Sequence, residues 1–80
     1  MTKKEFKEKL YELSLLYVLD EDDFENINNI DDLINKIYKL ADENDINIQE
    51  NLYELNLENL VEKYDDINRK IYGKEEYHID

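Results

Sequence analysis

The chain contains no cysteine, no proline and no tryptophan, and one glycine among its 80 residues. Without cysteine, neither a disulfide framework nor a thiolate metal site can form. The single histidine, His78, lies near the end of the sequence, so zinc binding is not expected. No apolar run reaches the roughly 18 residues of a membrane span, and the first residues lack the apolar segment of a signal peptide. We therefore expect a cytoplasmic protein with neither metal nor other cofactor.

Basic residues are scarce as well. Ten lysines and arginines face 22 aspartates and glutamates, which gives a net charge of −12. Such a chain repels phosphate backbones and anionic lipids, both of which proteins bind through cations. Direct nucleic-acid binding and membrane binding are therefore not expected. A protein with a basic surface is the natural partner, because the field would accelerate that encounter. The alternative is that the acidity serves solubility alone.

The apolar residues fall into stripes with helical spacing. These stripes predict helices over residues 3–19, 31–43 and 57–72, and a short helical turn within residues 49–55. No stretch alternates apolar and polar residues for long enough to predict a strand. The sequence therefore predicts an all-α fold, a small bundle of three to four helices.

The helix starts carry capping signals. Thr2 and Glu5 have the spacing of a capping box, in which hydroxyl and carboxylate satisfy the free N–H groups of the first turn. Asn29 or Asp31 can cap the second helix, and Asn56 can cap the last one.

Gly73 has the place of a left-handed residue that ends a helix. We therefore predict a single helical domain over residues 1–73, followed by a frayed tail over residues 74–80.

The expected core combines the stripes with three apolar residues of the loop between the first two helices. Tyr11, Tyr53, Tyr72 and Tyr77 fall outside it, and exposed tyrosine is typical of protein interfaces. The expected core residues are Phe6, Leu10, Leu13, Leu16, Tyr17, Phe24, Ile27, Ile30, Leu33, Ile34, Ile37, Tyr38, Ala41, Leu57, Leu60, Val61, Tyr64, Ile67 and Ile71.

No combination of residues predicts catalysis. Ser14 is the only serine and lies inside the first predicted helix, far along the sequence from His78. Residues 20–25 lie between two helices, as a calcium-binding EF-hand loop would. That loop needs a ligand at position 5 and glycine at position 6, where this chain has Phe24 and Glu25. We therefore expect no enzyme and no metal site.

A dense part of the acid lies in the loop over residues 20–25 and at the start of the second helix. If the acidity serves binding, this is where we expect the partner to bind. The predicted partner-binding residues are Asp22, Asp23, Glu25, Asp31, Asp32, Asp42 and Glu43.

The order of long helix, long loop, helix, short helix and last helix resembles the acyl and peptidyl carrier protein family. The likeness covers residues 24–67. Asp31-Asp32-Leu33 is similar to the family's Asp-Ser-Leu motif at the start of the second helix. Residues 40–48 are similar to the end of that helix and the Ile-x-Ile pattern after it, and residues 56–64 to the family's last helix.

The resemblance implies a carrier-like bundle whose second helix docks onto basic patches of partner proteins. The family's serine carries a phosphopantetheine arm, and Asp32 stands in its place. A carboxylate cannot form that phosphodiester, so the resemblance implies a carrier-like fold without its prosthetic group. The leading hypothesis is a non-catalytic, acidic protein-interaction module. The alternative is a phage-type inhibitor or immunity protein that acts as a nucleic-acid mimic, of the anti-CRISPR or anti-restriction class.

Overall fold

The computed structural model describes residues 2–17 and 19–76, and these residues contain helices and no strand. In chain order the elements are α1 (Lys3–Leu16), the 3₁₀ turn η1 (Glu21–Phe24), α2 (Ile30–Glu43), the 3₁₀ turn η2 (Leu52–Glu54) and α3 (Leu57–Glu76). The predicted all-α class, a small helical bundle, is confirmed.

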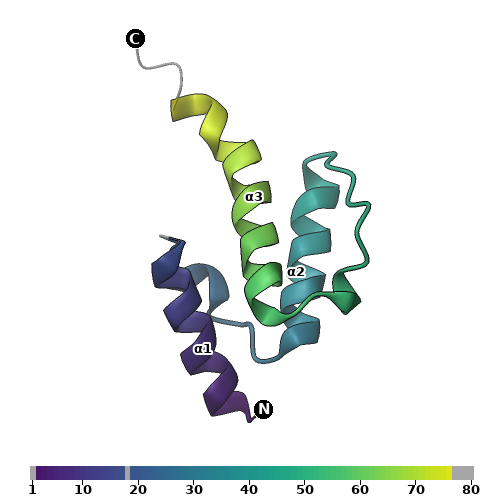
Figure 1. Ribbon diagram of the computed structural model, residues 1–80. Helices are drawn as coiled ribbons and strands as arrows, with labels where there is room; N and C mark the ends of the chain where they lie inside the picture. The colour runs from purple at the N-terminus through teal and green to yellow at the C-terminus, as the bar shows by residue number, and fades with distance from the viewer. Residues whose placement is uncertain (1, 18, 77–80) are drawn as a thin grey trace.

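The three helices run in the same general direction, and two irregular segments return the chain to the starting end (Figure 1). The first return, over residues 17–29, contains η1. The second, over residues 44–56, passes alongside α2 and contains η2. Helix α3 packs against both α1 and α2, so it is the central element of the bundle.

The predicted capping residues begin all three helices. Thr2 and Glu5 form the full capping box: Glu5 N donates to Thr2 Oγ1 at 3.1 Å, and Thr2 N donates to Glu5 Oε1 at 3.3 Å. Asn29 and Asn56 each accept a backbone N–H of the next turn at 2.8 Å, from residues 32 and 59. These side chains satisfy N–H groups that a helix leaves free at its start.

Helix α2 ends as predicted at Glu43, and the backbone of the next three residues ends it. Asp45 adopts a left-handed conformation with φ of 56°, which short polar residues tolerate better than most. Ile46 N then donates to Ala41 O at 2.8 Å, which satisfies a carbonyl of the last turn.

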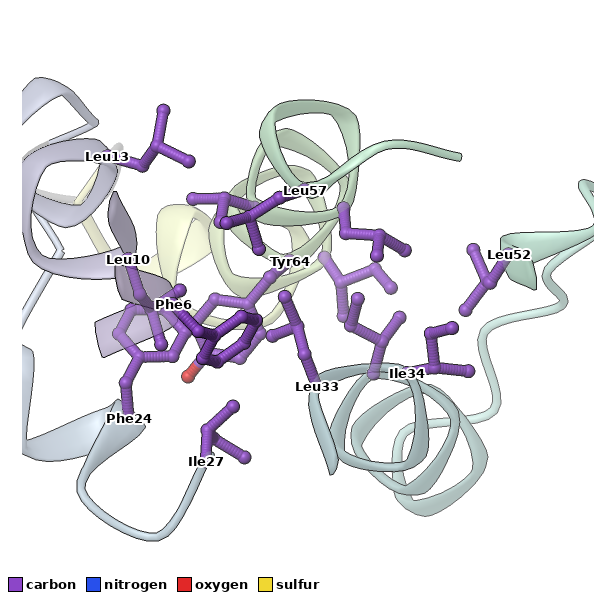
Figure 2. Packing of buried hydrophobic residues seen from close by; sticks show 14 of the residues in the cluster. Phe6, Leu10, Leu13, Phe24, Ile27, Leu33, Ile34, Leu52, Leu57 and Tyr64 are labelled. Atoms are coloured by element: carbon purple, nitrogen blue, oxygen red, sulfur yellow. The ribbon is translucent and has the colours of Figure 1, made fainter. Parts of the chain in front are cut away.

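The buried core contains side chains from every element. Phe6 and Leu10 of α1, Phe24 of η1 and Leu33 of α2 gather near Tyr64 of α3 (Figure 2). Phe24 and Tyr64 meet edge to face, with ring centroids 5.1 Å apart. The buried apolar residues are Phe6, Leu10, Leu13, Phe24, Ile27, Leu33, Ile34, Ile37, Ala41, Leu52, Leu57, Leu60, Val61, Tyr64 and Ile67.

Three residues predicted to be in the core are exposed instead. Leu16 is 67% exposed because it is the last residue of α1 and lies on a side of the helix that neither α3 nor η1 covers. Ile30 is 40% exposed, since it is the first residue of α2 and lies at the end of the bundle. Tyr38, 38% exposed, lies at the edge of the α2 stripe. Tyr17 and Ile71 are half-buried.

Two predicted helix ends were wrong. Helix α1 stops at Leu16, three residues early, where Tyr17 N donates to Leu13 O at 3.1 Å. Helix α3 continues through Gly73 to Glu76, and no glycine among the described residues has the positive φ of a helix-ending residue. Glycine in a helix costs only about 1 kcal/mol relative to alanine.

The predicted domain boundary at Gly73 therefore falls inside α3. Its last turns project beyond α1 and α2 (Figure 1). Residues 77–80 of the predicted tail lie outside the described residues. Within the described part of the chain, no helix has both the length and the apolarity of a membrane span.

Candidate functional site

The predicted loop acids lie around η1. Asp22 and Glu25 are exposed and line a hollow between α1 and η1. Lys7 of α1 lines the same hollow, and its Nζ donates to the carbonyls of Phe24 and Glu25 at 3.2 and 2.9 Å. The ammonium group of Lys7 therefore lies in the same hollow as these two predicted acids and joins η1 to α1.

Asp23 points to another side of η1. It is half-buried and lines a hollow of about 430 Å³ that Glu43 of α2 also lines. Lys36 and Lys39 line the same hollow, so its charge is mixed. Lys36 Nζ also lies 5.8 Å from the ring centroid of Tyr64, within the range of a cation–π contact.

Tyr64 is the buried wall of the hollow that Asp23 and Glu43 line. Its burial, followed by the negative charge of the neighbouring Asp23, raises the pKa of the Tyr64 hydroxyl. The hydroxyl stays protonated at neutral pH, and its direct aromatic neighbour is Phe24. These contacts attach η1 to α3 and account for the burial of Phe24.

Of the two acids at the start of α2, Asp32 belongs to the capping structure of the helix. Asp32 N donates to Asn29 Oδ1 at 2.8 Å, and Asn28 N donates to Asp32 Oδ2 at 3.0 Å. Asp32 is half-buried in this arrangement. Asp31 is exposed and lines a hollow that Lys3 also lines. Asp32 is therefore engaged structurally at the position that the carrier resemblance gives to the serine.

The seven predicted residues do not form one surface. Asp42 and Glu43 are exposed at the far end of α2, about 16 Å along the helix from Asp31. Five of the seven line three separate hollows, and each hollow also has at least one lysine in its lining. Asp22 and Glu25 line the first, Asp31 lines the second, and Asp23 and Glu43 line the third.

A different group of acids lies on one side of a single helix. Glu58, Glu62, Asp65 and Asp66 fall within about a third of the circumference of α3, since a helix turns 100° per residue. We call these four residues the α3 acidic ridge. Asp65 is buried and accepts from Arg69 Nε at 2.9 Å, whereas the other three are exposed. No ion pair involves those three among the described residues.

Tyr17, at the C-terminal end of α1, lies within the field of the ridge. Partial burial, followed by the charges of Glu62, Glu58, Asp65 and Asp66, raises the pKa of its hydroxyl. The ridge is therefore a concentrated region of negative potential beside a half-buried aromatic ring.

The spacing of the ridge could have been found in the sequence. Residues three and four apart are neighbours on a helix, and the charged residues at those distances from Glu62 are Glu58, Asp65 and Asp66. Like charges in this relation destabilise a helix slightly. For Glu58 the first turn of α3 offsets this cost, because the helix dipole favours an acid there, and for Asp65 the ion pair with Arg69 does so. Glu62 has only acidic charges at these distances, so helix stability does not explain it.

The serine of α1 is engaged within its own helix. Ser14 is buried, and its Oγ donates to Tyr11 O at 2.7 Å, within its own helix. The described residues contain no group of three or more histidine, cysteine or acidic side chains close enough to hold a metal ion. Residues 20–25 form the η1 turn and its flanks, with Asp20 accepting from Asp22 N at 3.0 Å.

Comparisons with models of protein families, with curated proteins and with solved structures find no match to this chain.

Proposed function

We propose that this protein is a non-catalytic, acidic interaction module that binds a partner protein with a basic surface. The observation that carries the proposal is the α3 acidic ridge. Its exposed carboxylates have no ion-pair partners among the described residues, and their mutual repulsion has a stability cost. A basic partner would relieve that repulsion on binding.

The ridge is preferred to the sequence-predicted surface for a physical reason. All of the predicted acids of the loop and α2 except Asp42 share their hollows with lysines or accept a capping hydrogen bond. The field that they present to a partner is therefore partly cancelled. Glu58, Glu62 and Asp66 present theirs along about 12 Å of one rigid helix.

The test is recovery of bound protein on immobilised chain at low and high salt. A ridge variant, E58Q/E62Q/D66N, is compared with a loop variant, D22N/E25Q/D42N, which changes the net charge by the same three units. At low salt we expect the wild type and the loop variant to retain a basic partner and the ridge variant to lose it, because only the ridge variant lacks the binding charges. At high salt we expect all three proteins to lose it, because exposed charges are already screened beyond about 10 Å at 0.1 M salt. Equal recovery by all three proteins at both salt concentrations would contradict the electrostatic proposal.

A nucleic-acid mimic is the alternative, and one observation favours it. The exposed ridge acids recur at about 6 Å of helix rise, a regular row of negative charge on one face. One strand of B-DNA has a phosphate about every 3.4 Å, so the row has roughly half that density. Competition with DNA for a basic nuclease separates the two: a mimic blocks nucleic-acid access, whereas a docking module leaves it unchanged.

The carrier resemblance is part of the leading proposal, as is a cytoplasmic location. The order of the elements and the place of Asp32 in the first turn of α2 support the carrier resemblance. Incubation with a phosphopantetheinyl transferase followed by mass spectrometry tests it. We expect no added mass on the wild type and the mass of the arm on Asp32→Ser. A D32S chain that stays unmodified would contradict the resemblance without affecting the docking proposal.

A further inference from the structure

The C-terminal end of α1 exposes apolar side chains alongside α3 (Figure 1). Leu16 is 67% exposed, and no large apolar side chain among the described residues is more exposed. Tyr17, the next residue, is half-buried and packs against the core. A single exposed leucine is common on protein surfaces, so its significance depends on the charges around it.

Leu16 lies on the side of α1 that is turned away from η1. Ser14 lines the hollow between α1 and η1, so it marks the η1 side of the helix. Leu16 is about 160° around the helix from Ser14 and about 60° from the buried Leu13. Leu13 and Leu57 of α3 lie on the same side of the core (Figure 2). Leu16 is therefore at the edge of the contact between α1 and α3, on the side opposite to η1.

The α3 acidic ridge lies next to this end of α1. Lys63 pairs with Glu50 of the segment alongside α2 at 2.6 Å, so it marks the α2 side of α3. Glu58 and Glu62 lie about 140° and 100° around the helix from Lys63, on the side that α2 does not cover. After partial burial, their charges contribute to the raised pKa of the Tyr17 hydroxyl, so their field reaches the end of α1.

A further acid lies on α1 itself. Glu12 precedes Leu16 by four residues, so the two exposed side chains are neighbours on one face of the helix. The last turn of α1 contains no basic residue, so no side chain of that turn offsets the negative end of the helix dipole. The exposed leucine therefore has acids on its own helix and on the neighbouring one. We give the name α1–α3 surface to Glu12, Leu16, Tyr17, Glu58 and Glu62.

The cations on these sides of the two helices are farther away. Lys9 is on the same side of α1 as Leu16 but about 10 Å nearer the start of the helix. Arg69 and Lys70 lie about 10–12 Å beyond Glu62 along α3, and Arg69 is paired with Asp65. The α1–α3 surface is therefore apolar at Leu16 and acidic around it.

We propose that the basic partner binds the α1–α3 surface through a segment in which lysines or arginines flank one large apolar residue. The apolar side chain packs on Leu16 and on the ring of Tyr17. The flanking cations meet Glu12 on one side and Glu58 and Glu62 on the other. An apolar centre within a polar rim is the usual composition of a specific interface. The inference rests on the proposed function and adds an apolar anchor to it.

Charge also decides which occupant fits this surface. A second copy of the chain has a net charge of −12 and presents the same acids, so two such surfaces repel each other. An anionic lipid surface is repelled in the same way. A segment with cations beside an apolar residue is the occupant that complements both parts of the surface.

Two fluorescent peptides test the anchor on the full chain: a lysine peptide with one central leucine, and the same peptide with serine at that position. Fluorescence anisotropy at low salt measures their dissociation constants. We expect the wild type to bind the leucine peptide about tenfold more tightly, because burying a leucine side chain contributes at least that factor. Leu16→Ser should remove most of this preference.

Leu15→Ser is the matched control. Leu15 is 61% exposed, similar to Leu16, but lies 100° farther around the helix from α3. This variant should keep the tenfold preference for the leucine peptide. The ridge variant E58Q/E62Q/D66N should bind both peptides weakly. Circular dichroism of each variant confirms that the helices are intact.

The outcomes separate this inference from the proposed function. Equal binding of the two peptides by the wild type, with binding lost in the ridge variant, would overturn the anchor and leave the docking proposal standing. No binding of either peptide by the wild type would overturn both. Equal loss of preference in Leu15→Ser and Leu16→Ser would overturn the placement of the anchor. A wild-type dimer in sedimentation velocity that Leu16→Ser abolishes would do the same, because a second copy would then cover the surface.

Discussion

The two acidic regions of this protein differ in what their carboxylates do. In the region formed by η1 and α2, Asp32 accepts a capping hydrogen bond, and Asp22 and Glu25 share a hollow with Lys7. On the α3 acidic ridge, only Asp65 has an ion-pair partner among the described residues. Of the seven predicted acids in the first region, one accepts a capping hydrogen bond and five others line hollows that also contain lysines. The second is less dense in sequence, and its exposed members Glu58, Glu62 and Asp66 have no ion-pair partner among the described residues.

The difference shows why charge density along a chain is a poor guide to charge density on a surface. Contiguous acids in a turn point in different directions, as Asp22 and Asp23 do toward two different hollows. Acids spaced by three and four residues on a helix point in the same direction. A helical repeat therefore concentrates charge more effectively than a continuous run.

The largest effect should come from detaching the η1 region from the core. Phe24→Ala removes the buried ring that packs on Tyr64. We expect a loss of about 3–5 kcal/mol in the free energy of unfolding, the usual cost of truncating a buried phenylalanine. Urea denaturation measures it. A loss below 1 kcal/mol would show that the core does not hold η1 in place.

Alkaline pH should destabilise the same region through Tyr64. The folded state raises the pKa of this hydroxyl above its unfolded value of about 10. The contribution is complete below pH 10 and is lost as pH rises above that value, by up to about 1.4 kcal/mol per pH unit. Thermal unfolding between pH 9 and 11.5 measures the loss. Tyr64→Phe should lose less stability over that interval, and an identical pH dependence would contradict the assignment.

The two acidic regions should respond to mutation with opposite signs. Asp32→Ala removes a capping acceptor and should cost about 1 kcal/mol of unfolding free energy. Glu62→Gln removes repulsion from acids three and four residues away and should add several tenths of a kcal/mol. Paired chemical denaturation curves measure both. Destabilisation by Glu62→Gln would mean that the ridge contributes to the fold rather than to binding.

The smallest effect concerns Tyr17. Neutralising the ridge with E58Q/E62Q/D66N should lower the pKa of Tyr17, because these charges contribute to its elevation. The loop variant D22N/E25Q/D42N should leave the pKa of Tyr17 unchanged. Following the Tyr17 ring resonance by NMR through alkaline pH distinguishes the two. Equal shifts in both variants would mean that net charge, and not the ridge, sets the local potential.

Much of the fold could be predicted because its signals are local. Thr2, Asn29 and Asn56 begin their helices as capping residues, and the apolar stripes identify most of the core. The exposed Leu16 and Tyr38 were missed because periodicity does not show which edge of a stripe a neighbouring element covers. Gly73 was misread because good helix formers follow it and carry α3 onward to Glu76.

The candidate site was predictable only in part. An acidic surface could be expected from the net charge, and its place on α3 from the spacing of Glu58, Glu62 and Asp66. The lysines that partly cancel the loop acids could not be predicted, because Lys7 and Lys36 reach them through the tertiary fold.

The most direct test is to map where a basic probe binds on the labelled, full-length chain. An oligolysine peptide is titrated at low salt, and backbone amide shifts are followed by NMR. The account predicts that the largest changes fall at Tyr17, Glu58, Glu62 and Asp66, and that salt abolishes them. Larger changes at Asp22, Glu25 and Asp42 would contradict it and return the binding surface to the loop and α2.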